Sequence, residues 1–159
     1  MRYSNCLRLL LPTALAMGLG AQMSPKLTIA PLPTVKAAKG AAAVVTVKAS
    51  LPPGYHANSD TPTEKYLVPL SLKWTGGPLQ AESVTYPKAS SEHYPFQKPG
   101  DKPLSVVTGE FSITTKFKVA PDANSGPASE TGTLRYQACD NRACYPPKNV
   151  PVSVTVSVQ

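Results

Sequence analysis

Two cysteines, Cys139 and Cys144, are the residues of this sequence best suited to do chemistry. Four residues separate them, and these begin with Asp140-Asn141, a pair that favours turns. The segments on either side alternate polar and apolar residues, as half-buried strands do. Facing residues of an antiparallel pair have Cα atoms about 4.5 to 5.5 Å apart, a distance that a disulfide can bridge. A disulfide between the two cysteines is therefore geometrically feasible.

Such a bond has two possible uses. Closing a ring of six residues stabilises a fold by only about 2 kcal/mol in the chain-entropy model, so it is a weak staple. A disulfide at an exposed bend is also prone to strain, which favours exchange with other thiols. The cysteine pair alone leaves both interpretations open, a permanent structural clip and an exchangeable bond.

Other polar residues are candidates for the surroundings of the sulfurs. His56 is either an acid-base helper or a hydrogen-bonded loop residue, and Asp140 either caps the turn or accepts a proton. Arg135 and Arg142 could stabilise a thiolate, but solvated arginines are the simpler interpretation. A metal site is not expected, because two thiols and one imidazole fall short of the four ligands of a structural zinc ion.

The composition predicts one all-β domain. A chain of 159 residues can bury a proper core, and its 18 scattered prolines argue against long helices. The formal charge is +7, but the basic residues form no dense run and do not alternate with aromatic residues. Nucleic acid is therefore not an expected partner. No Ser-His-Asp or paired-carboxylate arrangement favours a hydrolase.

The N-terminus has the features of a cleaved secretory signal peptide at Met1–Ala21. Arg2 and Arg8 supply its positive charge, an apolar stretch follows, and small residues end it. Cys6 is expected to leave with this segment. Without Arg2 and Arg8, 14 of the 16 basic residues remain against 9 acidic ones. The mature protein is expected in the periplasm or secreted, where disulfides persist.

The rest of the chain predicts a flexible leader at 22–40 and a β-sandwich domain at 41–159, with an open barrel as the alternative. Tyr55 and His56 fall in a predicted polar loop, and residues 88–102 and 121–132 in two longer loops. Strands are expected at Ala43–Leu51, Tyr66–Trp74, Leu79–Tyr86, Leu104–Val107, Phe111–Val119, Thr133–Ala138 and Val150–Val158.

Two runs around the cysteines, Tyr136-Gln137-Ala138-Cys139 and Cys144-Tyr145-Pro146-Pro147, resemble the cysteine hairpin of the N-terminal periplasmic domain of the DsbD family of thiol:disulfide interchange proteins. The resemblance extends in the same order over about Ala41 to Val158. Its other segments are Gly54–Asn58, Tyr66–Pro69, Val84–Pro87 and Gly109–Phe111.

The resemblance implies an immunoglobulin-like two-sheet β-sandwich in which Cys139 and Cys144 are a redox pair. The partners it implies are periplasmic thioredoxin-like proteins or disulfide isomerases, including those of cytochrome c assembly. It requires no cofactor. A separate membrane electron donor is expected, because the membrane and thioredoxin-like domains that follow in the family are not in this sequence. The family also suggests that Cys139 bonds to partners and Cys144 resolves the mixed disulfide.

In this family an aromatic residue on a short loop covers the disulfide. Phe96 is the first candidate for this cap and Tyr94 the second, with a simple loop anchor as the alternative for Phe96. Tyr55, His56, Asp140 and Tyr145 are expected in the same environment.

A second hypothesis makes the protein a non-catalytic secreted binding module with a structural disulfide. Equilibration against glutathione separates the two, since structural disulfides have potentials below about −300 mV and exchangers lie near −200 mV.

Overall fold

The computed structural model describes residues 25–159. The predicted signal peptide, with Cys6, lies outside the described residues. Twelve strands and no helix are found in residues 25–159. They are β1 (Thr28–Ile29), β2 (Val35–Ala37), β3 (Ala42–Ser50), β4 (His56–Asn58), β5 (Ser71–Trp74), β6 (Leu79–Thr85), β7 (Ser90–Glu92), β8 (Leu104–Thr108), β9 (Glu110–Val119), β10 (Gly126–Tyr136), β11 (Ala138–Cys139) and β12 (Lys148–Val158). No helix long and apolar enough to cross a membrane occurs in this part of the chain.

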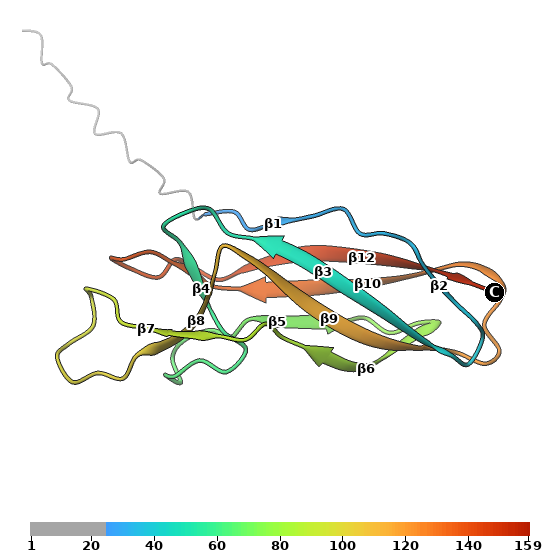
Figure 1. The fold of residues 1–159 in the computed structure, drawn as a ribbon, viewed down its shortest axis with the longest axis horizontal. Helices are drawn as coiled ribbons and strands as arrows, with labels where there is room; N and C mark the ends of the chain where they lie inside the picture. Colours follow the sequence, from blue (N-terminus) through green and yellow to red (C-terminus); the bar gives the residue numbers. More distant parts are fainter. Residues whose placement is uncertain (1–24) are drawn as a thin grey trace, which may run out of the picture.

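The strands form three sheets of four strands each (Figure 1). Sheet A has the order β1-β3-β9-β6, sheet B the order β2-β12-β10-β5 and sheet C the order β11-β4-β8-β7. The pairing of β2 with β12 is parallel, and every other pairing of described strands is antiparallel. The predicted immunoglobulin-like sandwich is confirmed, with sheet C added at one end of it.

Period-two alternation explains the main layers. Strands β3, β9, β10 and β12 each bury every second residue, which places one apolar face of sheet A and one of sheet B in a shared core. The largest fully buried side chains of this core include Tyr136, Phe117, Ile113 and Leu134. Burial of each such side chain contributes about 1.5 to 3 kcal/mol.

Residues 25–40 are not the flexible leader expected for 22–40. Strand β1 pairs with the end of β3, and β2 pairs with β12. The buried Tyr136 hydroxyl accepts a hydrogen bond from the Leu27 backbone N–H (3.0 Å) and donates one to the Pro25 carbonyl (3.1 Å). Partners distant in the chain therefore order a segment whose own periodicity is weak.

Strand β10 begins earlier than predicted. It starts at Gly126, whereas residues 121–132 were expected to form a loop. Gly126, Pro127 and Gly132 weaken the strand signal in the sequence, but β10 pairs with β12 along its whole length. Glu130 faces inward in this strand and accepts hydrogen bonds from the Thr75 hydroxyl and the Gly76 N–H, both at 2.8 Å. These bonds satisfy a carboxylate that burial would otherwise disfavour.

Strand β5 is shorter than the predicted Tyr66–Trp74 strand and begins at Ser71. Pro69, which has no N–H to donate, precedes this start. The Leu70 N–H bonds instead to the Ser59 carbonyl at 3.0 Å. The polar loop expected around His56 also differs, because His56–Asn58 form the fully buried strand β4.

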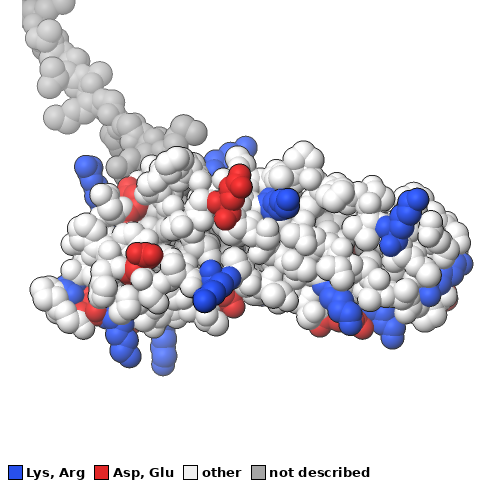
Figure 2. Space-filling view, viewed as in Figure 1, with Lys and Arg blue, Asp and Glu red and all other residues white. Residues whose placement is uncertain are grey.

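Charged side chains are scattered over the face seen in Figure 2, with no dense group of one sign. The ion pair found among the described residues joins Lys116 and Glu82 at 2.8 Å on exposed strand faces. Such a pair contributes little to stability in water.

Candidate disulfide site

Sheet C presents two different faces. Ala57, Val107 and Ala138 point into the main core between sheets A and B. Because side chains alternate along a strand, their neighbours His56, Val106 and Cys139 lie on the opposite face. There Leu67, Leu104 and Val106 form a second, smaller cluster of buried residues. The cysteine hairpin is therefore mounted on the side of the sheet that faces away from the main core.

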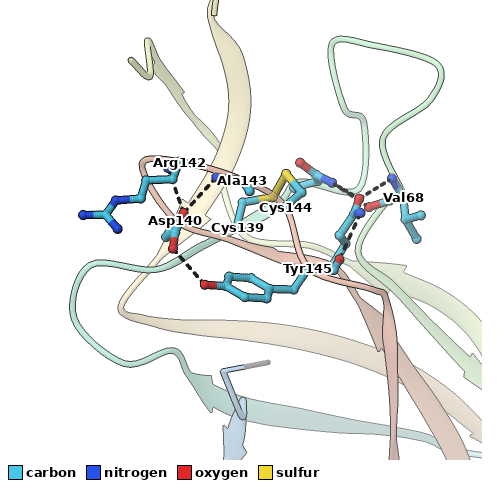
Figure 3. The surroundings of a disulfide bond; sticks show 9 residues. Val68, Cys139, Asp140, Arg142, Ala143, Cys144 and Tyr145 are labelled. Carbon is cyan, nitrogen blue, oxygen red and sulfur yellow. Dashed lines mark hydrogen bonds between the residues drawn. A yellow bond between two sulfur atoms is a disulfide. The ribbon is translucent and has the colours of Figure 1, made fainter. Parts of the chain in front are cut away.

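Cys139 and Cys144 form a disulfide (Figure 3). Their Cα atoms are 3.9 Å apart, closer than expected for two facing strands. The reason is a tight hairpin: the Asp140 N–H donates to the Ala143 carbonyl (2.9 Å) and the Tyr145 N–H to the Ala138 carbonyl (2.8 Å). The two cysteines meet as an isolated β-bridge at the end of β11 rather than in two long strands.

Asp140 holds the turn between the cysteines. Its Oδ1 accepts hydrogen bonds from the backbone N–H groups of Arg142 (2.7 Å) and Ala143 (2.9 Å), and its Oδ2 accepts one from the Tyr145 hydroxyl (2.9 Å; Figure 3). These bonds stabilise the ionised carboxylate and lower the pKa of Asp140 below its usual value, with the Ala143 bond the largest cause. In the oxidised protein Asp140 therefore caps the turn, which is one of the two roles considered for it.

Tyr145 connects the hairpin to the loop before β4. Its hydrogen bond to Asp140 raises the pKa of the Tyr145 phenol to about 12. Its ring lies 6.1 Å from the ring of Tyr55, centroid to centroid, in a tilted arrangement. Tyr55 and Tyr145, which were both expected near the disulfide, thus lie close to each other.

Gln137 fixes the base of the hairpin, a role that the sequence did not reveal. Its Oε1 accepts hydrogen bonds from Asn58 Nδ2 and from the Val68 N–H, both at 3.0 Å. Its Nε2 donates to the Tyr145 carbonyl at 3.2 Å. Asn58 also donates to the Val68 carbonyl at 3.0 Å. One amide side chain therefore ties together the hairpin, β4 and the segment before β5.

The two sulfurs differ in access. Cys139 is completely buried, whereas Cys144 is partly exposed and packs against the small cluster of Leu67, Leu104 and Val106. Of the two cysteines, Cys144 is therefore the one that solvent reaches in the oxidised protein.

His56 is the direct partner of Cys139 across the β4–β11 pair. It is 2 % exposed, and its Nε2 has no hydrogen-bond partner. Burial lowers the pKa of His56 to about 4, against an opposing effect of the nearby Asp140 charge. The imidazole is therefore neutral at physiological pH.

Tyr94 covers this imidazole. The two rings stack with centroids 3.9 Å apart, and Tyr94 also packs on the small cluster that Cys144 contacts. Phe96, the first candidate for the cap, stacks on the outer side of Tyr94 at 5.7 Å and is 40 % exposed. The aromatic residue next to the disulfide environment is thus Tyr94, with Phe96 behind it.

Hydrogen bonds within the loop that carries both aromatic residues hold its backbone in place. We call residues 94–103, between β7 and β8, the aromatic loop. Gln97 accepts a bond from the Tyr94 N–H (2.9 Å) and donates one to the Lys102 carbonyl (2.8 Å). Asp101 accepts one from the Lys98 N–H at 2.8 Å. The loop that the sequence marked as irregular is a folded one.

The remaining candidates are more peripheral. The side chains of Arg135 and Arg142 are exposed, and the structure gives neither an ion pair. No group of three or more His, Cys, Asp or Glu residues suited to a metal ion occurs within residues 25–159.

Comparisons with known proteins show the fold. No family model and no curated protein matches this chain. The N-terminal periplasmic domain of ScsB from Proteus mirabilis has a similar structure, with a TM-score of 0.50 and 15% identity over 82% of this chain and 44% of that one. The chain thus spans less than half the length of that structure. A type I cohesin from Clostridium thermocellum, seen with its dockerin, matches over 84% of this chain and 99% of its own at 14% identity and a TM-score of 0.44.

Proposed function

We propose that this protein exchanges disulfides with other exported proteins through Cys139 and Cys144. The observation that carries the proposal is the placement of the disulfide: one partly exposed and one buried cysteine, on the face of sheet C that does not touch the main core. A bond in such a place opens without disturbing the sandwich. As a structural clip the bond would gain little, because the entropic stabilisation grows with the length of the loop and this ring has six residues.

The exchange needs no group beyond the two cysteines. A thiolate of a reduced partner attacks Cys144 Sγ, the S–S bond breaks, and Cys139 leaves as a thiolate that takes up a proton. A second partner thiol then attacks the mixed disulfide and releases Cys144. The partner is oxidised to a disulfide and this protein is reduced to a dithiol. The reverse sequence returns the two electrons to a partner that carries a disulfide.

Access favours Cys144 as the cysteine that bonds to partners, with Cys139 as the resolving cysteine. This assignment is the reverse of the one suggested by the family resemblance. The reason is burial: an external nucleophile reaches the partly exposed Cys144 and not the enclosed Cys139.

In the same proposal, the aromatic loop is a cover that a docking partner moves aside. Tyr94 shields the His56 side of the site, and the loop lies outside the main core. Docking of a partner would displace the loop and increase the access to the disulfide. Partners of this kind are thioredoxin-like proteins or disulfide isomerases, with a separate membrane protein as electron donor.

The proposed compartment is the periplasm. The predicted signal peptide supports export, and the fold is shared with a domain described as periplasmic. An oxidising compartment also suits a protein whose chemistry depends on a disulfide.

Trapping tests the proposal. The Cys139→Ala variant lacks the resolving thiol, so we expect it to accumulate mixed disulfides through Cys144 that are visible on non-reducing gels of periplasmic extracts. The Cys144→Ala variant should form few, and the double variant none. Absence of adducts with both single variants would rule out exchange.

The competing function is that of a binding module with a permanent clip, which the complete burial of Cys139 favours. Equilibration of the purified protein with glutathione buffers separates the two. A midpoint near −200 mV supports exchange, and one below about −300 mV supports a clip.

A further inference from the structure

His56 is a buried polar residue whose environment is incomplete in the oxidised protein. Its Nε2 has no hydrogen-bond partner although the side chain is 2 % exposed. A buried polar atom left unpaired costs about 1 to 3 kcal/mol, so a group that bonds to it in another state of the protein would stabilise that state.

The strand register identifies that partner. His56 faces Cys139 directly across β4 and β11, and side chains in such pairs begin from Cβ atoms about 4.5 to 5.5 Å apart. In the disulfide, Cys139 has no hydrogen to donate. After reduction, the Cys139 thiol is a buried hydrogen-bond donor. The Nε2 nitrogen of the neutral His56 imidazole is a suitable acceptor for it.

We propose that His56 Nε2 accepts the hydrogen bond of the reduced Cys139 thiol and takes its proton when Cys139 resolves a mixed disulfide. This inference rests on the proposed function and assigns to His56 the part of the base in one step of it. Cys144 has no need of such a base, because it is partly exposed and water and buffer reach it.

The step is balanced as follows. Cys139 loses its proton to His56 Nε2 while its sulfur attacks Cys144 Sγ in the mixed disulfide. The Cys139–Cys144 bond forms, the bond from Cys144 to the partner breaks, and the partner leaves as a thiolate. The imidazolium then gives its proton to solvent. No oxidant other than the disulfide of the partner is required.

Few charged groups lie near this imidazole. Tyr94 stacks on it from the aromatic loop, and the charge of Glu92, the last residue of β7, acts on Tyr94. Asp140, next to Cys139, is the carboxylate whose charge reaches it. Because burial is what weakens His56 as a base, displacement of Tyr94 on docking strengthens it towards the usual imidazole pKa of about 6.5. His56 therefore acts as a base in the free protein and becomes a stronger one when a partner is in place.

A small aromatic disulfide, 5,5′-dithiobis(2-nitrobenzoate), isolates the step without a protein partner. The reduced protein releases one thiolate when Cys144 attacks the reagent and a second when Cys139 resolves the adduct. In His56→Phe, which keeps a stacking ring, we expect the second release to slow about 100-fold, the lower end of what a positioned base contributes. The first release should stay within about twofold.

The pH dependence separates a base from a merely structural residue. Between pH 6.5 and 8 the second release should be nearly constant in the wild type. In His56→Phe it should rise about tenfold per pH unit, because it then follows the fraction of Cys139 thiolate. His56→Gln, which accepts a hydrogen bond but no proton, should behave as His56→Phe does. His93, an exposed residue directly before Tyr94 in the sequence, is changed to Gln as the matched control and should match the wild type.

Equal second-phase rates and pH slopes in folded wild type and His56→Phe would overturn the proposal. If the variants do not fold, ¹⁵N spectra of the wild type decide. The His56 Nε2 resonance should move on reduction and the His93 resonances should not, and an unmoved His56 resonance would refute the inference. These measurements use no cellular partner, so the two proposals can fail separately. A failure to trap mixed disulfides in extracts would count against the exchange function, and the results above would count against the role of His56.

Discussion

Asp140 carries three hydrogen bonds of the hairpin on one carboxylate, two from backbone N–H groups and one from Tyr145. The sequence predicted the turn, because Asp and Asn favour such turns for local reasons, but it left open whether Asp140 caps the turn or accepts a proton. The role of Gln137 was not predictable. Its partner Asn58 lies 79 residues away in the chain, and no local pattern marks a hydrogen bond of that range.

Replacement of Asp140 tests the local origin of the hairpin. Asp140→Ala removes the acceptor of two backbone N–H groups, and we expect a loss of about 1 kcal/mol in the free energy of unfolding, measured with urea. Asp140→Asn keeps an oxygen acceptor and should lose less. Equal losses in the two variants would show that the charge, and not the hydrogen-bond geometry, stabilises the turn.

The same carboxylate predicts a dependence on acidity. The pKa of Asp140 is lowered in the folded protein, so its contribution is complete above the unfolded carboxyl pKa of about 3.9 and is lost as pH falls through the lower folded value. We expect the wild type to lose stability below pH 4 more steeply than Asp140→Asn. Urea unfolding at intervals between pH 5 and pH 2 provides the measurement, and parallel curves would contradict the expectation.

At the scale of elements, the long alternating strands β3, β9 and β12 were predicted close to their observed bounds, because every second residue is apolar. Strand β4 was missed. It is three residues long and contains His56 and Asn58, whose burial depends on partners in other strands. The order of Tyr94 and Phe96 was also beyond prediction, because internal bonds of Gln97 set the path of the aromatic loop.

The aromatic loop offers a test of protection. In Tyr94→Ala the small cluster beside Cys144 loses its cover, so we expect dithiothreitol to reduce the disulfide about tenfold faster, because exchange rates follow access. Phe96→Ala is the control and should change the rate less than about twofold, since Phe96 packs on the outer side of Tyr94. A larger effect at Phe96 than at Tyr94 would assign the cover to Phe96 instead.

Strand β10 contains a glycine that packing requires. A Cβ at Gly132 would lie 2.6 Å from Trp74 Cε3 and 2.8 Å from the Lys73 carbonyl oxygen. We expect Gly132→Ala to cost about 1 to 3 kcal/mol, the usual range for overpacking, in equilibrium unfolding. Ser153→Ala, at an exposed position of the neighbouring β12, is the control and should be close to neutral. A neutral Gly132→Ala would mean that β5 shifts freely away from β10.

At the scale of the molecule, the two cores divide the protein into a large sandwich and a small corner that carries the disulfide. The sandwich could be predicted from alternation and chain length. The corner could not, because its members come from four separate segments whose apolar residues are too few to produce a pattern. This division is the physical basis for treating the hairpin as a site rather than as part of the framework.

The N-terminal segment is expected to belong to the large core. Tyr136→Phe leaves the buried Leu27 N–H and Pro25 carbonyl without their partner, and we expect a loss of about 1 to 3 kcal/mol. Amide hydrogen exchange should rise in residues 25–29 and stay unchanged at the hairpin. Unchanged exchange in 25–29 would show that strand pairing alone holds this segment.

Short outer strands close the sandwich in sheets A and B. Strand β1 has two residues and β2 has three, and Pro31 and Pro33 lie between them. Long, flat outer strands recruit other chains by adding strand to strand, whereas short ones interrupted by proline offer too few free N–H groups to do so. The N-terminal segment thus covers the last residues of β3 and of β12, and loss of residues 25–37 would free the backbone groups of these two strand ends to pair with neighbouring copies.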